Sequence, residues 1–167
     1  MTFTLITTGG TIDKVYGSGL GVRDLHIGDP VTPAILRDIL HVPCNLHIEL
    51  FRKDSLDITS DDRGKICRAV KKSKANLCLI THGTDTMFET ARTIRGISDL
   101  AGYRDKRVVL VGASQPACMR DSDAIARISF AVGVLLSSFK PAVIVAMDGV
   151  HTDLINGKKG EDGIFRS

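Results

Sequence analysis

Short apolar runs recur along the chain, separated by longer stretches of mixed polarity. The runs are FTLI (3–6), LHIEL (46–50), LCLI (77–80), RVVLVG (107–112) and AVIVAM (142–147). Runs of this length that are rich in Val, Ile and Leu predict β-strands. RVVLV and AVIVA are continuous rather than alternating, which is typical of strands buried on both faces of a parallel sheet.

The intervening stretches repeat their apolar residues with a helical period. One of them opens with Ser60, a candidate N-cap, followed by two aspartates that suit the first turn of a helix. Strands that alternate with helices of this length form βαβ units around a parallel sheet. We therefore predict a doubly wound, mostly parallel five-stranded α/β sheet with helices on both faces, a three-layer Rossmann- or flavodoxin-like fold. The predicted helices lie within 32–42, 60–73, 84–101 and 122–138.

The length and composition limit the classes of protein to consider. A chain of 167 residues predicts one domain over residues 1–167, large enough to bury a single core. A net charge of +3 and an aromatic content of 5% argue against a nucleic-acid-binding protein. No apolar run approaches the ~18 residues of a membrane helix, and no charged segment precedes the first apolar run as in a signal peptide, so we expect a cytoplasmic location.

The cysteines and histidines show no metal-binding pattern. The four cysteines form no CxxC pair, and the five histidines show no HExxH spacing. Scattered cysteines of this kind are typical of reduced residues in a cytosolic domain. We therefore expect neither a metal site nor a disulfide.

Polar or glycine-rich segments follow the predicted strands, where ligands of doubly wound sheets bind. TTGGT (7–11), after the first strand, has no GxGxxG of a dinucleotide site, GxxxxGK[ST] of a P-loop or GxSxG of a nucleophile elbow. A threonine hydroxyl beside glycines remains, and it becomes a nucleophile only when a base takes its proton. Lys14, Tyr16 and groups from the other strand ends are the candidate helpers.

THGTDT (81–86) follows the third strand and leads into a predicted helix. Thr84 or Asp85 could simply cap that helix. The segment nevertheless has more polar groups than one helix start needs, and the free N–H groups of a helix start can bind an anion. Glycines 17, 19 and 21 likewise suit either a surface loop or the hinges of a lid that closes over the site.

Two of these segments occur together in one known family. TGGTI (8–12) and ITHGTDTMFETA (80–91) resemble the two signatures of the bacterial-type L-asparaginases, in the same order, and GASQPACMRDSDA (112–124) is similar to a further segment of that family. The resemblance covers essentially the whole chain, but only the larger N-terminal domain of the usual two-domain enzyme. It implies a short, single-domain member that lacks the C-terminal domain.

The resemblance implies an amidohydrolase that acts on the side-chain amide of a small amino acid. Thr11, the second threonine of TGGT, would attack the amide, ammonia would leave, and water would hydrolyse the acyl-enzyme, with no metal or organic cofactor. Thr84 and Asp85 would act with a lysine that follows the fifth strand, Lys158 or Lys159, of which Lys158 is slightly favoured. Because a lysine is a base only when it is neutral, Asp85 is expected mainly to orient groups and to bind the substrate ammonium.

The remaining contacts to the substrate are expected from the strand ends. Main-chain N–H groups around Gly10, Thr11 and Thr84 would stabilise the oxyanion. The residues expected to bind the substrate are Gly10, Arg52, Lys53, Asp54, Ser55, Gly83 and Ser114.

The chain departs from the family pattern in three respects. Leu25 stands where the family's lid has a tyrosine, and Tyr16 is a candidate replacement. Arg52 and Lys53 stand in place of a Ser-Gln pair that holds the substrate α-carboxylate. Arg52 could bind that carboxylate through a bidentate fork, or it could form a structural ion pair. The acid that a neighbouring subunit's C-terminal domain lends to the site would be missing.

These departures leave a second function open, a catalytically weak or inactive amino-acid-binding module of the same fold. An amidotransferase-type partner acting on a charged tRNA shares the signatures, but the small net charge and the lack of extra domains argue against it. The expected partners are a small-molecule substrate and further copies of the chain, as a homodimer or homotetramer. Neither a nucleic acid nor a membrane is expected.

Overall fold

The computed structural model describes residues 2–17, 24–98, 100, 102–148, 150–153 and 157–166. The main sheet has the order β4-β1-β5-β6-β7-β8, in which β8 (Val150–Asp153) is antiparallel to β7 and the other pairs are parallel. The doubly wound, mostly parallel fold is confirmed, and β8 adds a sixth strand to the five that the sequence predicted. The parallel strands are β1 (Phe3–Gly9), β4 (Leu46–Lys53), β5 (Leu77–Thr81), β6 (Arg107–Val111) and β7 (Ala142–Met147).

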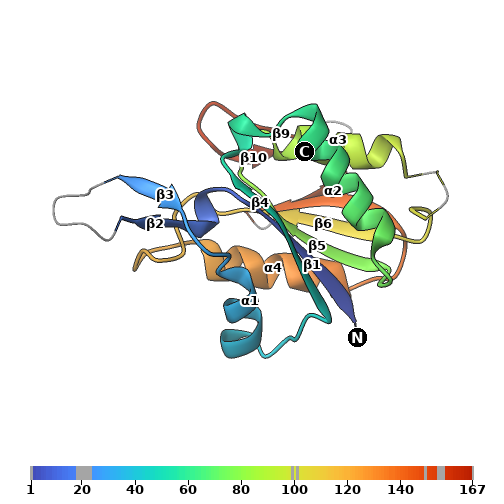
Figure 1. Cartoon of the computed structure of the whole chain (residues 1–167), viewed down its shortest axis with the longest axis horizontal. Helices are drawn as coiled ribbons and strands as arrows, with labels where there is room; N and C mark the ends of the chain where they lie inside the picture. The colour runs from blue at the N-terminus through green and yellow to red at the C-terminus, as the bar shows by residue number, and fades with distance from the viewer. Residues whose placement is uncertain are drawn as a thin grey trace.

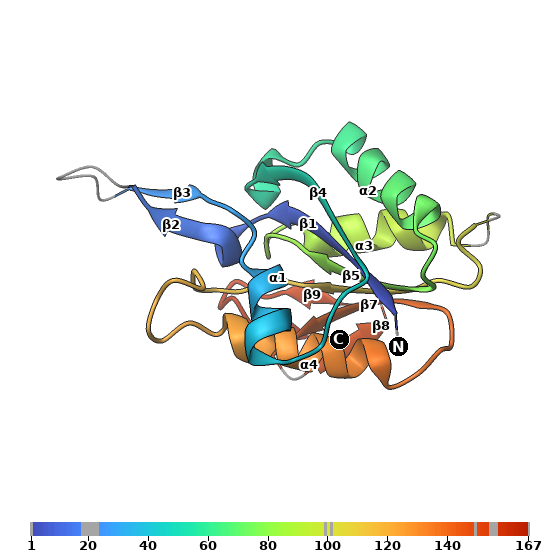
Figure 2. The same cartoon turned by 60° about the horizontal axis from the view of Figure 1, so that its bottom comes forward.

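Helices cover both faces of this sheet (Figures 1 and 2). The helices α2 (Ser60–Lys72) and α3 (Met87–Gly96) lie on one face. On the other face lie α4 (Ala124–Leu136) and α1 (Thr32–Ala34), which continues into the π-helix η2 (Ile35–Ile39). All residues of β1, β5 and β6 are buried, and so are all residues of β7 except Ala142. This confirms the burial predicted from the continuous apolar runs RVVLV and AVIVA.

The N-terminus of α2 is capped by Thr59 rather than by Ser60. Thr59 Oγ1 accepts a hydrogen bond from the Asp62 N–H at 3.3 Å, and the Asp62 carboxylate accepts one from the Thr59 N–H at 3.2 Å, which completes a capping box. Asp62 is buried and also pairs with Lys53 and Lys65, which hold the pKa of its carboxyl well below the usual range. This network ties the end of β4 to the start of α2.

Two short antiparallel pairs lie outside the main sheet. The strands β2 (Lys14–Tyr16) and β3 (Leu25–Ile27) form a hairpin that projects from the molecule beyond the carboxyl ends of the parallel strands (Figure 1). The strand β9 (Lys158–Lys159) pairs with β10 (Phe165–Arg166). The glycines expected at 19 and 21 of a lid lie outside the described residues. Within the described ranges, no helix has the length and apolar character needed to cross a membrane.

Candidate active site

The switch point of the sheet lies between β1 and β5. From β1 the chain crosses to β4 on one side, and from β5 it proceeds to β6 and β7 on the other. Ligands of doubly wound sheets bind at the carboxyl ends of the strands at such a point. TGGT directly follows the core of β1 and THGTD follows β5, so both segments lie at the switch point.

The segments meet through their glycine backbones. Gly10 has φ of 91°, and a Cβ at this position would lie 2.6 Å from the Gly83 Cα and N atoms. A Cβ at Gly83 would lie 2.7 Å from the Ser55 Cβ. Only glycine fits at two such approaches, so these residues let the ends of β1, β4 and β5 come together. Thr11, Ser55 and Thr84 are thereby placed in one cluster.

Thr11 begins the 3-10 helix η1 (Thr11–Asp13) and is half-buried. Neither its hydroxyl nor its N–H has a hydrogen-bond partner among the residues that the structure describes. The N–H of the preceding residue, Gly10, is by contrast occupied by the Lys53 carbonyl at 3.0 Å. The Thr11 hydroxyl and N–H are therefore available to a bound molecule.

Lys159 bridges the two polar residues of THGTD. Its Nζ donates to Thr84 Oγ1 at 2.9 Å and to the Asp85 carboxylate at 2.5 Å. Lys158, the preceding residue of β9, is exposed, because successive residues of a strand point to opposite sides. The geometry selects Lys159 as the partner of Thr84 and Asp85, and this corrects the slight preference for Lys158.

The helix that follows THGTD does not use Thr84 or Asp85 as a cap. It begins at Met87, its N-cap is Thr86, and no side chain caps it. The Thr86 hydroxyl donates instead to the Ser55 carbonyl at 2.7 Å, and the Asp85 N–H donates to Ser55 Oγ at 3.2 Å. The capping interpretation of Thr84 and Asp85 is therefore wrong, and their side chains contact Lys159 instead.

Ser55 belongs to this cluster, whereas the three residues before it form ion pairs. Ser55 is 1% exposed in the 3-10 helix η3 (Ser55–Asp57), directly against the THGTD segment. Arg52 forms a structural ion pair, the second of the two alternatives that its position left open. The ion-pair partners are Glu49 and Asp29 for Arg52, Asp62 for Lys53, and Lys14 for Asp54.

Two further predicted site residues lie outside the cluster. Tyr16 is 56% exposed on β2, and its hydroxyl makes no hydrogen bond to Thr11. Its cross-strand partner is Leu25, and residues directly opposite in a hairpin share one face, so the phenol lies on the same face as Leu25. Ser114 is exposed in the loop after β6, where its N–H donates to the Asp123 carboxylate at 3.0 Å.

Sequence reasoning missed two buried titratable groups beside the cluster. Asp13 is 1% exposed, and its Oδ1 accepts a hydrogen bond from the Val31 N–H at 3.0 Å. Burial raises the pKa of Asp13 to about 6. His82 is fully buried, and burial lowers the pKa of its ring to about 4. The signal for both was their position, because His82 stands between a threonine and a glycine of THGTD, and Asp13 stands two residues after Thr11.

The side chains of this cluster suit acyl transfer. Within the described ranges, no group of three or more His, Cys, Asp or Glu side chains gathers as a possible metal site. The cluster consists of hydroxyls, a lysine–carboxylate pair and unpaired main-chain N–H groups. Such groups can supply a nucleophile, carry a proton and stabilise an oxyanion.

Comparison with known proteins places this arrangement in a family. The family model described as Asparaginase, N-terminal, matches residues 2–159. The glutaminase-asparaginase of Acinetobacter glutaminasificans is 29% identical over 141 residues, which are 80% of this chain and 41% of the relative. The probable periplasmic L-asparaginase of Haemophilus influenzae is 32% identical over 153 residues, which are 87% of this chain and 42% of the relative. The chain thus spans less than half the length of these curated relatives.

Solved structures share the fold. The thermostable L-asparaginase from Thermococcus kodakarensis superposes with a TM-score of 0.77 at 23% identity, over 100% of this chain and 51% of that one. The probable cytoplasmic L-asparaginase from Campylobacter jejuni gives a TM-score of 0.75 at 23% identity, over 94% of this chain and 49% of that one. Because the family model covers nearly the whole chain, this protein belongs to the asparaginase family and corresponds to the family's N-terminal domain.

Proposed function

We propose that this chain is an L-asparaginase-like amidohydrolase, which converts the side-chain amide of a small amino acid into the acid and ammonia. The observation that carries the proposal is the Lys159 bridge to Thr84 and Asp85 beside the unpaired Thr11 hydroxyl, at the switch point of the sheet. The names of the relatives, an asparaginase and a glutaminase-asparaginase, support asparagine and glutamine as the first substrates to test. No cofactor enters this proposal.

Thr11 is the proposed nucleophile. Its Oγ1 forms a bond to the amide carbon while its proton passes to a neighbouring base, and the amide nitrogen takes up a proton and leaves as ammonia. The negative charge that develops on the amide oxygen is stabilised by the N–H groups of Thr11 and Thr84, neither of which has an acceptor among the described residues. Water then attacks the acyl-enzyme, releases the acid and restores the threonine hydroxyl.

Lys159 and Thr84 are the proposed proton carriers. The 2.9 Å contact between Lys159 Nζ and Thr84 Oγ1 gives a path along which a proton can pass through the hydroxyl to the lysine in its neutral, amine form, and return from it to the leaving nitrogen. Asp85 holds the lysine in place, and it is 46% exposed, so a second side of its carboxylate can bind the substrate ammonium. The Ser55 hydroxyl accepts from the Asp85 N–H and keeps its own hydrogen to donate to a substrate carboxylate.

Tyr16 is the proposed replacement for the lid tyrosine of the family. The support is its position opposite Leu25, because exchanging the two residues of a cross-strand pair leaves the phenol on one face of the hairpin. Tyr16→Phe should lower kcat at least about tenfold by removing a proton-transfer group. The double exchange Tyr16→Phe with Leu25→Tyr should restore part of that loss. Equal kcat for all three proteins in an ammonia-release assay would remove Tyr16 from the mechanism.

The decisive experiment measures ammonia release from asparagine, glutamine and other small amides. The unaltered protein should release ammonia, and Thr11→Ala should lower kcat by more than about a thousandfold with little change in melting temperature, since it removes the nucleophile. Thr93→Ala is the matched control, because Thr93 is exposed on α3 and its hydroxyl only donates to the Glu89 carbonyl. Binding of aspartate without turnover of any amide would favour the amino-acid-binding module instead.

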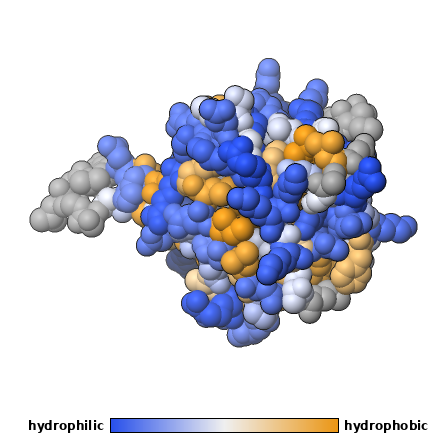
Figure 3. Space-filling model, turned by 45° about the vertical axis from the view of Figure 1, so that its right-hand side comes forward, coloured by the Kyte–Doolittle hydropathy of each residue, from blue (hydrophilic) through white to orange (hydrophobic). Residues whose placement is uncertain are grey.

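We also propose that the chain works in the cytoplasm as a homo-oligomer. Large apolar side chains such as Leu56 and Phe139 are 72% and 66% exposed, and they could contribute to a contact between copies. Figure 3 shows hydrophobic groups scattered among hydrophilic ones on one face. The Campylobacter neighbour is named a cytoplasmic enzyme and the Haemophilus relative a periplasmic one, so cell fractionation must test the location. Light scattering that gives a monomer mass would contradict the oligomer.

A further inference from the structure

His82 is buried beside the proposed oxyanion donors, and none of the steps above uses it. Its side chain is 0% exposed. Both ring nitrogens make short contacts, since Nδ1 lies 2.7 Å from the Gly83 carbonyl oxygen and Nε2 lies 2.9 Å from Thr90 Oγ1. The ring therefore connects the THGTD segment to α3.

These two partners determine which nitrogen has the hydrogen. The Gly83 carbonyl oxygen can only accept, so Nδ1 must donate to it. Burial lowers the pKa of His82 to about 4, so the ring is neutral near pH 7 and Nε2 has a lone pair. Nε2 then accepts a hydrogen bond from the Thr90 hydroxyl. The hydrogen bond between His82 and Gly83 therefore has a fixed direction, with Nδ1–H as the donor and the carbonyl oxygen as the acceptor.

The bond to Gly83 sets the orientation of the peptide group that joins Gly83 to Thr84. A trans peptide group is planar, and its C=O and N–H point in opposite directions. No cis peptide bond occurs in the described part of the chain. Because the Gly83 oxygen points toward the imidazole ring, the Thr84 N–H points away from it. This N–H has no acceptor among the described residues, so it can bind the oxyanion.

Gly83 needs such an external restraint. Glycine has no Cβ and tolerates backbone conformations that other residues avoid, so its peptide group can rotate at low cost. The close approach of Gly10 and Ser55 makes glycine necessary here, but that approach limits the position of the Cα rather than the direction of the carbonyl. A rotated peptide would turn a carbonyl oxygen toward the substrate oxyanion and repel it.

We propose that His82 is a positioning residue, whose Nδ1–H holds the Gly83–Thr84 peptide so that the Thr84 N–H faces the developing oxyanion. The inference rests on the proposed amidohydrolase function. The oxyanion is present in the transition state and not in the bound substrate, so loss of this positioning should lower kcat and leave KM nearly unchanged.

Asparagine and glutamine at position 82 can each reproduce one of the two hydrogen bonds of the imidazole ring. In His82→Asn the amide nitrogen can occupy the place of Nδ1, which keeps the donor to Gly83 and loses the contact with Thr90. In His82→Gln the amide oxygen can occupy the place of Nε2, which keeps the contact with Thr90 and loses the donor. We expect His82→Asn to keep kcat within about threefold and His82→Gln to lower it about a hundredfold, the effect of losing one oxyanion donor. KM should change less than about twofold in both.

Thr90→Val removes the hydroxyl that contacts His82 Nε2 and leaves the imidazole ring in place. Its kcat and KM should stay within the limits given for His82→Asn. Equal losses of kcat in all three variants, or losses that follow the melting temperature, would show a merely structural histidine and overturn the proposal. So would a KM increase equal to the loss of kcat.

An NMR measurement decides the inference independently of turnover. The amide signal of Thr84 should shift strongly in His82→Gln and stay close to its original position in His82→Asn and in Thr90→Val. If the unaltered protein hydrolyses no amide, the proposed function fails while this comparison still tests the positioning. An unchanged Thr84 signal in His82→Gln would overturn the positioning even in an active enzyme.

Discussion

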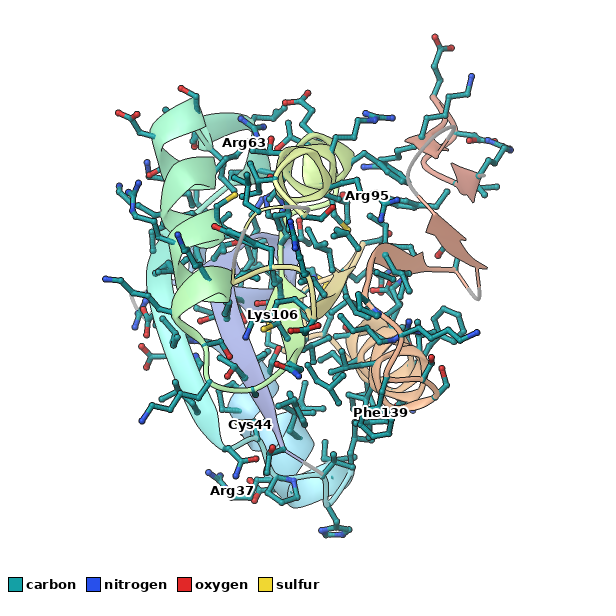
Figure 4. All side chains as sticks on the ribbon, turned by 90° about the vertical axis from the view of Figure 1, so that its right-hand side faces the viewer. Arg37, Cys44, Arg63, Arg95, Lys106 and Phe139 are labelled. Carbon is teal, nitrogen blue, oxygen red and sulfur yellow. The ribbon has the colours of Figure 1, made fainter. Side chains whose placement is uncertain are left out.

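The two ends of the central sheet differ in how completely their buried polar groups are hydrogen-bonded. At the amino end, which faces the viewer in Figure 4, Lys106 and Arg107 are only 9% and 7% exposed. Burial lowers the pKa of Arg107, yet main-chain carbonyl oxygens accept hydrogen bonds from both cations. The acceptors are the carbonyls of Ser73 and Ala75 for Lys106, and those of Val134 and Lys140 for Arg107.

At the carboxyl end, buried polar groups remain without partners. Across the described ranges, four buried side-chain atoms lack a hydrogen-bond partner, and they belong to the last residue of β5, to η1 and to the first turns of α1 and α2. Buried polar groups are normally paired, so the carboxyl end is the less completely hydrogen-bonded end of the described sheet. The atoms are Asp13 Oδ2, Thr32 Oγ1, Arg63 Nε and Thr81 Oγ1.

A lysine can therefore be structural at one end of the sheet and a candidate proton carrier at the other. Lys106 is held by two carbonyl oxygens, which cannot give up or pass on a proton. Lys159 is held by a hydroxyl and a carboxylate, and its side chain is 26% exposed. The partners, rather than the residue type, separate a contribution to stability from one to chemistry.

The largest expected effect separates Lys159 from its neighbour in sequence. Lys159→Met should lower kcat for amide hydrolysis by more than about a thousandfold, because Thr84 then loses its partner in proton transfer. Lys158→Met is the matched control and should keep kcat within about twofold, since Lys158 is exposed. Steady-state ammonia release measures both, and equal losses would contradict the assignment of Lys159.

Removal of the amino-end lysine should affect stability instead. Lys106→Met leaves the Ser73 carbonyl oxygen without this partner, while Ser73 Oγ still donates to the Ala75 carbonyl. It should lower the free energy of unfolding by about 3 kcal/mol, roughly 2 kcal/mol for the unpaired oxygen and roughly 1 kcal/mol for the second lost bond. The kcat of the folded fraction should stay within about twofold. Urea unfolding measures the stability, with Arg95→Met on the exposed surface of α3 as a control that should change it by less than about 0.5 kcal/mol. A Lys106→Met protein that keeps its stability but has a lower kcat would contradict the assignment of Lys106 to stability rather than catalysis.

The smallest expected effect is a pH dependence caused by Asp13. Burial raises its pKa from 3.8 to about 6 in the folded protein, so between about pH 4 and pH 6 the folded state binds a proton that the unfolded state has lost. This makes the folded protein less stable as the pH rises through that window, by no more than about 3 kcal/mol, at about 1.4 kcal/mol for each pKa unit. Asp13→Asn has no charge to bury, so it should gain stability relative to the unaltered protein between pH 4 and pH 7.

Urea unfolding at several pH values checks this prediction. Asp38→Asn is the control of opposite sign, because the Arg37 guanidinium beside Asp38 lowers the pKa of that exposed carboxyl. Its replacement should therefore lose stability relative to the unaltered protein as the pH rises. A difference between Asp13→Asn and the unaltered protein that is the same at every pH would show that the pKa of Asp13 is equal in the folded and unfolded states, and it would contradict this prediction.

The sequence by itself determined the sheet and the segments at its functional end. Continuous apolar runs such as 107–112 and 142–147 can be buried on both sides only inside a parallel sheet covered by helices, so the fold followed from their pattern. The motifs TGGT and THGTD follow strands of that sheet, and parallel strands end at one edge. Their approach could therefore be predicted, whereas the roles proposed for Thr11 and Thr84 came from the resemblance to the asparaginase signatures.

Only the tertiary structure decided which side chains point into the cluster. Lys159 rather than Lys158 reaches Thr84 because the β9–β10 pairing sets which residue of that strand faces inward. Ser55 lies against Gly83 while Arg52 pairs elsewhere, which depends on how β4 ends. Shifting a strand by one residue reverses every side chain in it, and no local pattern in these polar segments records that choice. The physical reason is that pairing between distant segments, and not spacing along the chain, orients their side chains.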